Sequence, residues 1–217
     1  VRSVADPSES ATAPGRLRRP RAPGGVEKGG LTDAVQALEL PTTALITFAD
    51  ELRVGLMGTV RRVLAPRGVK VRQRVQMARE WRYLVLAVDG RQGRLYWGWS
   101  PSMKSADLAP TVQGWHAAGV QAVIWDGATG HGGPEVVEIG LPRIKLPPVS
   151  PELNPAERVF EYIRDRIEGH VDGSIEDKVA KVEAVLAELA ATPARVQSLA
   201  GWDWIHDALA RIAVQAA

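Results

Sequence analysis

The chain contains no cysteine, which excludes a disulfide framework, a thiolate metal site and a cysteine nucleophile. It has no run of about 18 apolar residues and no charged start followed by an apolar segment, so neither a membrane span nor a signal peptide is predicted. Glycine-rich phosphate-binding loops and the sequence context of a serine hydrolase are also missing. We therefore expect a cytoplasmic protein that uses no nucleotide cofactor and binds no membrane.

The composition is that of a globular protein. The 217 residues suffice for one domain with a sizeable core, and 45% of them are hydrophobic and 24% charged. Residues 1–30 differ, because nine of them are proline or glycine and almost no aliphatic periodicity is present. We expect a flexible linker or tail over residues 1–40, a folded core over 41–170 and helices packed on that core over 171–217.

Charge is unevenly distributed along the chain. The net charge is +2, yet the segment from Arg53 to Arg82 holds nine basic residues and one acid, and the chain from Pro151 onward holds seven basic residues and twelve acids. A concentrated basic segment on a nearly neutral protein is typical of a polyanion-binding surface. A solvated loop and strand face is the alternative interpretation.

Alternating apolar runs and helical periodicity predict an α/β fold. Five short apolar runs bounded by turn residues predict strands over 42–51, 83–90, 94–99, 121–126 and 143–148. Helical patterns cover 108–118, 155–168, 174–191 and 202–214. This order favours a mixed sheet flanked by helices, in which chemistry gathers at the carboxyl ends of neighbouring strands.

Two aspartates follow predicted strands. Asp50 closes the first strand and Asp126 the fourth, so in neighbouring parallel strands their carboxylates would lie about 5 Å apart. Like charges at that separation repel unless a cation lies between them, and carboxylate oxygens suit Mg²⁺ or Mn²⁺. Two such ions can activate water and stabilise a leaving oxygen in phosphodiester cleavage. Turn formation and helix capping are the alternative roles of such aspartates.

Glu157 is a third candidate acid. The run SPELNPAERVFEYIRDRI places Asn154 at a helix N-cap, Pro155 at the first helical position and Glu157 at the acid position of a capping box. Capping alone would explain that carboxylate. Glu157 also lies at the rim of the apolar stripe, from which it could point toward the two aspartates.

Three runs of the sequence together resemble a known family. IKLPPVSPELNPAERVFEYIRDRI, VIWDGATGH and ITFADELRVGL are similar to the DDE-type transposases of mariner-like bacterial insertion sequences, over Thr43 to Ile167. The resemblance implies a ribonuclease H-like catalytic core that cleaves DNA and transfers strands. It implies that Asp50, Asp126 and Glu157 are the catalytic, metal-binding triad for two Mg²⁺ or Mn²⁺ ions. Glu51 and Asp89 are further carboxylates near strand ends that could replace a missing ligand.

The resemblance also implies partners. We expect DNA, both transposon ends and target, with a homodimer as one further possibility and the bacterial nucleoid as the location. The residues expected to contact DNA are Arg53, Arg61, Arg62, Lys70, Arg72, Arg74 and His131. His131 matches a family histidine, although a solvated loop side chain is the alternative.

Members of the family also carry helix-turn-helix modules, for which the first 40 residues are too few and too rich in proline and glycine. We expect the catalytic part alone. The alternative is an inactive or truncated remnant that acts only as a DNA-binding or interaction module.

Overall fold

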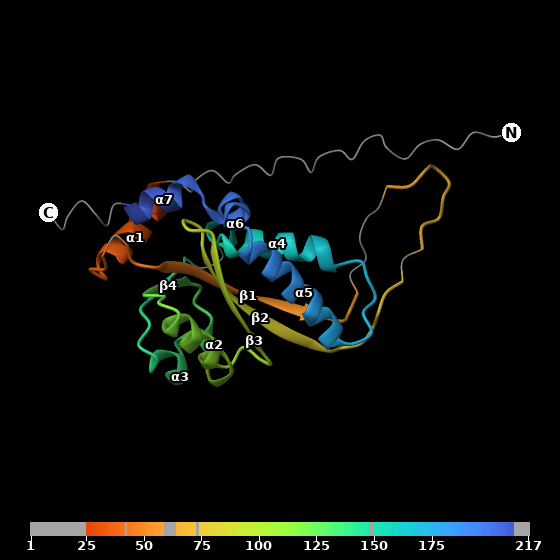
Figure 1. Cartoon of the computed structure of the whole chain (residues 1–217), viewed down its shortest axis with the longest axis horizontal. Coiled ribbons are helices and arrows are strands. Elements are labelled where there is room, and N and C mark those ends of the chain that lie inside the picture. The colour runs from red at the N-terminus through yellow and green to blue at the C-terminus, as the bar shows by residue number, and fades with distance from the viewer. Residues whose placement is uncertain (1–24, 42, 59–63, 73, 148–149, 211–217) are drawn as a thin grey trace.

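A five-stranded mixed sheet forms the centre of the protein (Figure 1). The structure is a computed structural model that describes residues 25–41, 43–58, 64–72, 74–147 and 150–210. The strands lie in the order β3-β2-β1-β4-β5. Their bounds are Ile46–Gly55 for β1, Trp81–Asp89 for β2, Arg94–Ser100 for β3, Ala122–Trp125 for β4 and Arg143–Lys145 for β5.

The sheet combines an antiparallel half with a parallel half. β2 pairs antiparallel with β1 and β3, whereas β4 pairs parallel with both β1 and β5. The strands predicted over 83–90 and 94–99 are confirmed, and β2 and β3 form an antiparallel hairpin. Its turn is closed by Asp89, whose Oδ1 accepts the backbone N–H groups of Arg91 and Gln92, and by Gly93, whose φ of +69° suits glycine.

β1 is longer than the sequence predicts. Asp50 was expected to end this strand, but β1 continues to Gly55 and stays paired with β2 to that point. The expectation is wrong because Leu52 and Val54 continue the alternation of buried side chains beyond the two acids. Asp50 therefore lies in the middle of a strand that is paired along its length.

Helices cover both faces of the sheet. The α-helices are α1 Gly25–Gln36, α2 Ser105–Ala117, α3 Pro134–Val137, α4 Ala156–Ile167, α5 Ile175–Ala190, α6 Pro193–Ala200 and α7 Asp203–Ala210, and the 3₁₀ turns are η1 Thr129–Gly132 and η2 Pro151–Leu153. One face packs against α4, α5 and α6 and, farther along, against α1 and α7 (Figure 1). The other face packs against α2 and α3. The predicted α/β architecture is confirmed.

Helix α4 is held by its apolar stripe. Val159, Phe160, Ile163 and Ile167 are buried against side chains of β1 and β2. Each such side chain contributes roughly 1.5–3 kcal/mol on burial. The helix begins at Ala156, one residue later than predicted, and this packing fixes the position of its first turn beside the sheet.

The expected tail is partly folded. Residues 25–36 form α1, and Leu31, Ala34, Val35 and Leu38 join the core near α7. Their spacing is that of one helical face, a signal that the neighbouring glycines obscured. Residues 1–24 lie outside the described residues. None of the helices in the described ranges is long and apolar enough to cross a membrane.

Candidate active site

Asp50 and Asp126 lie at the same level of two neighbouring parallel strands. The β1–β4 register pairs Ile46 with Ala122 and Phe48 with Ile124. Two residues farther along the chain are Asp50, within β1, and Asp126, directly after the end of β4. Side chains in register on parallel strands share a face of the sheet. The first and fourth strands are therefore neighbours in a parallel pair, which is the arrangement that the closeness of the two aspartates required, and both carboxylates line one cavity.

Glu157 reaches the cavity of the two aspartates from the first turn of α4. All three acids line one cavity of about 390 Å³, together with Lys145 and Asn154. Glu157 points partly elsewhere, because its Oε2 lies 3.8 Å from Nη1 of Arg164. Within the described ranges, no three acidic or histidine side chains are close enough to share one ion. The structure thus gathers the three acids around one cavity without converging them on one point.

Asn154 connects α4 to β1. Its buried amide donates from Nδ2 to the Ala49 carbonyl (2.8 Å) and to Asp50 Oδ2 (3.1 Å). Its Oδ1 accepts the backbone N–H of Ala156 at 3.1 Å. The sequence predicted only a helix-capping role for Asn154. Its hydrogen bond to Asp50 forms because the helix packs beside the strand.

The Asp50 carboxyl is strongly perturbed. Its pKa is raised to about 7, chiefly by burial and also by the negative charges of Glu51, Glu157 and Asp126, while the hydrogen bond from the Glu51 backbone N–H opposes the rise. A carboxyl in this setting is stabilised as the anion by a nearby cation. Together with the oxygen-only donors Asp126 and Glu157, this fits Mg²⁺ or Mn²⁺ in charge and ligand type.

Lys145 is a site residue that the sequence did not reveal. The β4–β5 pairing sets Lys145 opposite Trp125, and the long side chain reaches the cavity by passing over Gly127. Its chain crosses Gly127 so closely that a Cβ there would lie 2.1 Å from Lys145 Cε. Glycine at 127 therefore allows the ammonium group to lie in the cavity with the acids.

His131 differs most from its expected role. Its ring is buried and cannot contact DNA directly in this structure, so the predicted DNA contact is wrong. Glu51 contacts this histidine on the opposite face from Asp50, and Asp89 is engaged in the hairpin turn. Neither carboxylate lines the cavity, so neither replaces a triad member.

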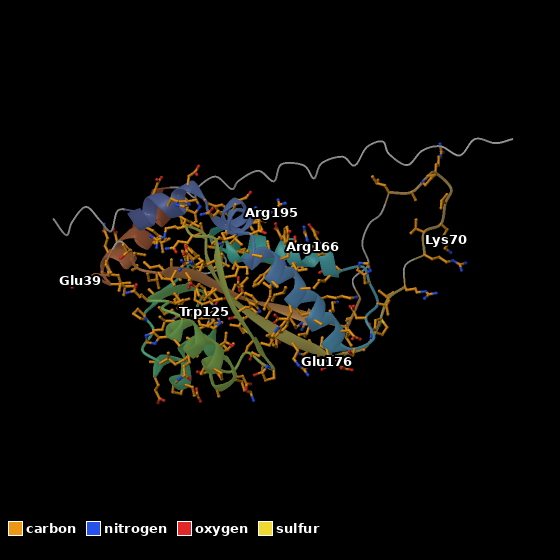
Figure 2. The ribbon with its side chains drawn as sticks, in the orientation of Figure 1. Glu39, Lys70, Trp125, Arg166, Glu176 and Arg195 are labelled. Carbon is orange, nitrogen blue, oxygen red and sulfur yellow. The ribbon has the colours of Figure 1, made fainter. Side chains whose placement is uncertain are left out.

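The other residues predicted to contact DNA lie in or beside the long segment that connects β1 to β2. Lys70, Arg72 and Arg74 are exposed there, and Figure 2 shows Lys70 far from the sheet. Arg53 is exposed on β1, with its guanidinium 5.5 Å from the centre of the Trp81 ring. Arg61 and Arg62 lie outside the described residues.

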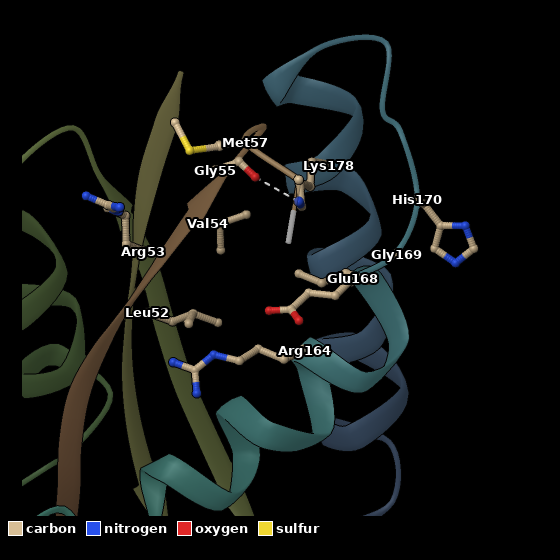
Figure 3. Close-up of a pocket in the computed structure, with 12 residues that line it drawn as sticks. Leu52, Arg53, Val54, Gly55, Met57, Arg164, Glu168, Gly169, His170 and Lys178 are labelled. Carbon is tan, nitrogen blue, oxygen red and sulfur yellow. Dashed lines mark hydrogen bonds between the residues drawn. The ribbon is translucent and has the colours of Figure 1, made fainter. Parts of the chain in front are cut away.

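A second cavity of about 430 Å³ lies at the far end of β1 (Figure 3). The buried Lys178 donates there to the Gly55 carbonyl at 2.7 Å. Figure 3 shows Arg164 of α4 and Glu168, directly after the end of α4, extending into the same space. Arg164 lines this cavity and also pairs with Glu157, so it connects the two cavities.

Solved structures share this architecture. The chain matches the Mos1 mariner paired end complex with Mn at a TM-score of 0.54 and 12% identity, covering 84% of this chain and 62% of that one. It matches a pre-cleavage Mos1 transpososome at a TM-score of 0.57 and 13% identity, covering 86% of this chain and 62% of that one. For the Mos1 strand transfer complex the TM-score is 0.56 and the identity 16%, and the match covers 86% of this chain and 59% of that one. The likeness shows the expected ribonuclease H-like fold.

The chain spans about three fifths of the length of these Mos1 chains. A comparison with curated proteins gives no significant match. The family model for the DDE superfamily endonuclease matches residues 45–177, which include every strand and helix that lines the acidic cavity. This chain belongs to the DDE superfamily endonuclease family.

Proposed function

We propose that the chain is the catalytic core of a transposase, which cleaves DNA and transfers its strands in a reaction that depends on divalent metal ions. The observation that carries the proposal is the placement of Asp50 and Asp126 two residues beyond the paired Phe48 and Ile124, with Glu157 lining the same cavity. Family membership supports it independently. Among the structures of similar fold, one is described as a paired end complex with Mn and another as a strand transfer complex.

Asp50, Asp126 and Glu157 would hold two Mg²⁺ or Mn²⁺ ions. When bound, such ions supply an activated water or hydroxyl nucleophile and stabilise the leaving oxygen of a phosphodiester. The Asp50 carboxyl, with its pKa raised to about 7, must lose its proton for this. Glu157 must also release its ion pair with Arg164. Because its carboxylate is partly exposed, it can do so by rotating its side chain farther into the cavity.

Other side chains would orient the reactants. Asn154 fixes the Asp50 carboxylate through Nδ2. Lys145 brings a cation into a cavity that is otherwise acidic, where it can bind a non-bridging phosphate oxygen of the DNA. The exposed Arg53, Lys70, Arg72 and Arg74 would contact phosphates without reading sequence.

The partners follow from this role. Transposon ends and target DNA are the proposed substrates, and a homodimer that holds two ends is the proposed assembly. The proposed location is the nucleoid in the cytoplasm of a bacterial cell, as the resemblance to transposases of bacterial insertion sequences implies.

The test is cleavage of DNA carrying the element's ends in Mg²⁺ or Mn²⁺. Asp126→Asn should abolish nicking and strand transfer while the protein keeps its fold by circular dichroism. Asp207→Asn, at an exposed position of α7, is the matched control and should cleave as the wild type does. Nicking that survives Asp126→Asn would contradict the proposal. A wild type that binds DNA but never cleaves it would favour the remnant that acts only by binding.

A further inference from the structure

Glu51 and His131 form a buried pair behind the acidic cavity. Neighbouring residues of a strand point to opposite faces, so Asp50 faces the cavity while Glu51 faces the layer of α2 and α3. The Glu51 side chain is 5% exposed and the His131 side chain 0%. Both groups are therefore polar, buried and outside the cavity that holds the triad.

The imidazole of His131 lies between two carboxylates. Its Nδ1 is 2.7 Å from Asp126 Oδ1, and its Nε2 is 3.1 and 3.2 Å from the two oxygens of Glu51. The ring stacks on Trp125 with centroids 3.7 Å apart and planes 17° from parallel. These contacts fix both the position and the plane of the ring.

We propose that Glu51 and His131 are positioning residues for Asp126, which orient its carboxylate toward the divalent cation of the cavity. This proposal rests on the proposed function. The Asp126 side chain is 54% exposed, so burial alone does not hold it. The Oδ1 atom of Asp126 contacts Nδ1 of His131 and also accepts a hydrogen bond from the backbone N–H of Ala128 at 3.0 Å. The carboxylate is thereby fixed in rotation, and Oδ2 is the oxygen available to the cavity.

The pair is poorly explained by stability alone. Burying a carboxylate and an imidazole carries a desolvation cost that apolar side chains of the same size avoid. The surrounding layer is apolar, with Trp115, Val123 and Val136 among its members. Carboxylate partners that orient a metal-binding group typically change metal affinity about 10–100-fold when they are removed.

Glu51→Gln is the principal test, because it keeps the volume and removes the charge. We expect the affinity for Mg²⁺, measured by calorimetry on the full chain, to fall about tenfold or more. The melting temperature should fall, because the buried His131 loses a charged partner, but stay above the temperature of the titration, so that the variant is folded when the affinity is measured. Glu135→Gln, an exposed acid on α3 on the same side of the sheet, is the matched control and should leave the affinity unchanged.

Glu51→Asp provides a second variant if Glu51→Gln does not fold. It keeps the charge and retracts the carboxylate by one methylene, so we expect an affinity between those of the wild type and Glu51→Gln. Nuclear magnetic resonance of the wild type adds a readout that needs no variant. Addition of Mg²⁺ should shift the imidazole nitrogen resonances of His131 and leave those of His116, exposed on α2, in place.

The outcomes separate this proposal from the proposed function. A wild type that binds no Mg²⁺ would overturn both. A wild type that binds Mg²⁺, with Glu51→Gln and Glu51→Asp at wild-type affinity, would overturn only the positioning role. Loss of affinity accompanied by an equal loss in Glu135→Gln would also overturn it, because the effect would then be one of net charge. Unmoved His131 resonances on saturation with Mg²⁺ would contradict it in the wild type itself.

Discussion

The side-chain amide of Asn154 donates to the Asp50 carboxylate across 104 positions of the chain, at 3.1 Å. The same residue accepts the Ala156 backbone N–H, so one side chain joins the start of α4 to the middle of β1. The position of Glu157 relative to Asp50 therefore depends on Asn154. This relationship links the stability of the core to the geometry of the acidic cavity.

Asn154→Ala should cost about 1–3 kcal/mol of unfolding free energy, because it leaves the buried Ala49 carbonyl and the Ala156 N–H without this partner. It should also weaken Mg²⁺ binding, since Asp50 and the start of α4 lose their connection. Urea denaturation and calorimetry measure the two effects. Glu152→Ala, exposed in the preceding turn, is the control and should change neither. Wild-type stability in Asn154→Ala would refute the role of the connection.

The stability of the metal-free protein should fall as the pH rises. The pKa of Asp50 is about 7 in the folded state, against 3.8 for an ordinary aspartate, so the folded state binds the extra proton between those values. The pKa of His131 is also raised, chiefly by Glu51 acting against the burial that lowers it, and its contribution is lost as the pH rises through the folded value. Both groups act in the same direction.

Asp50→Asn should therefore stabilise the metal-free protein by roughly 2–4 kcal/mol at pH 8 and by little at pH 4. The measurement is urea denaturation at several pH values with a chelator present. Saturating Mg²⁺ should reduce the difference, because the cation stabilises the wild-type carboxylate and not the amide. A difference independent of pH would contradict the raised pKa.

Arg164 competes with the cation for Glu157. The pair is partly exposed, at 3.8 Å, and such pairs contribute up to about 1 kcal/mol. Arg164→Gln should therefore tighten Mg²⁺ binding by up to about fivefold, as seen by calorimetry. Arg166→Gln is the control, because Arg166 instead stacks on the Tyr162 ring at 3.3 Å. Weaker binding in Arg164→Gln alone would show that Arg164 assists the site.

Lys145 should act on the DNA and not on the fold. Lys145→Gln is expected to lower DNA cleavage at saturating Mg²⁺ about tenfold or more, with little change in stability, because the side chain is exposed at the cavity. Gly127→Ala should reproduce the defect, since its Cβ would displace Lys145. Lys104→Gln, exposed before α2, serves as the control. Cleavage at the wild-type rate in Lys145→Gln would exclude a role in binding phosphate.

Much of the cavity could be predicted because its parts follow local rules. The apolar runs ending near Asp50 and Asp126 indicated two strands, and their parallel pairing then set the acids side by side. The stripe of α4 likewise fixed which helix turn carries Glu157. The end of β1 differs from the prediction, because the buried Leu52 and Val54 continue the strand alternation past the two acids.

The residues that the sequence missed depend on packing between distant segments. Lys145 reaches the cavity only because β5 pairs with β4 and Gly127 leaves room. The burial of His131 depends on the path of η1 over Trp125, which no local pattern encodes. The helix α1 carries a periodic apolar signal, but its three glycines have low helix propensity, and only packing near α7 compensates for this.

The central claim is that Asp50, Asp126 and Glu157 bind divalent cations together. The most direct test is calorimetric titration with Mg²⁺ and Mn²⁺ of the wild type and of Asp50→Ala, Asp126→Asn and Glu157→Gln. The account predicts saturable binding by the wild type and a loss of about tenfold or more in each variant. Absence of binding by the wild type, or unchanged binding by Glu157→Gln, would contradict it.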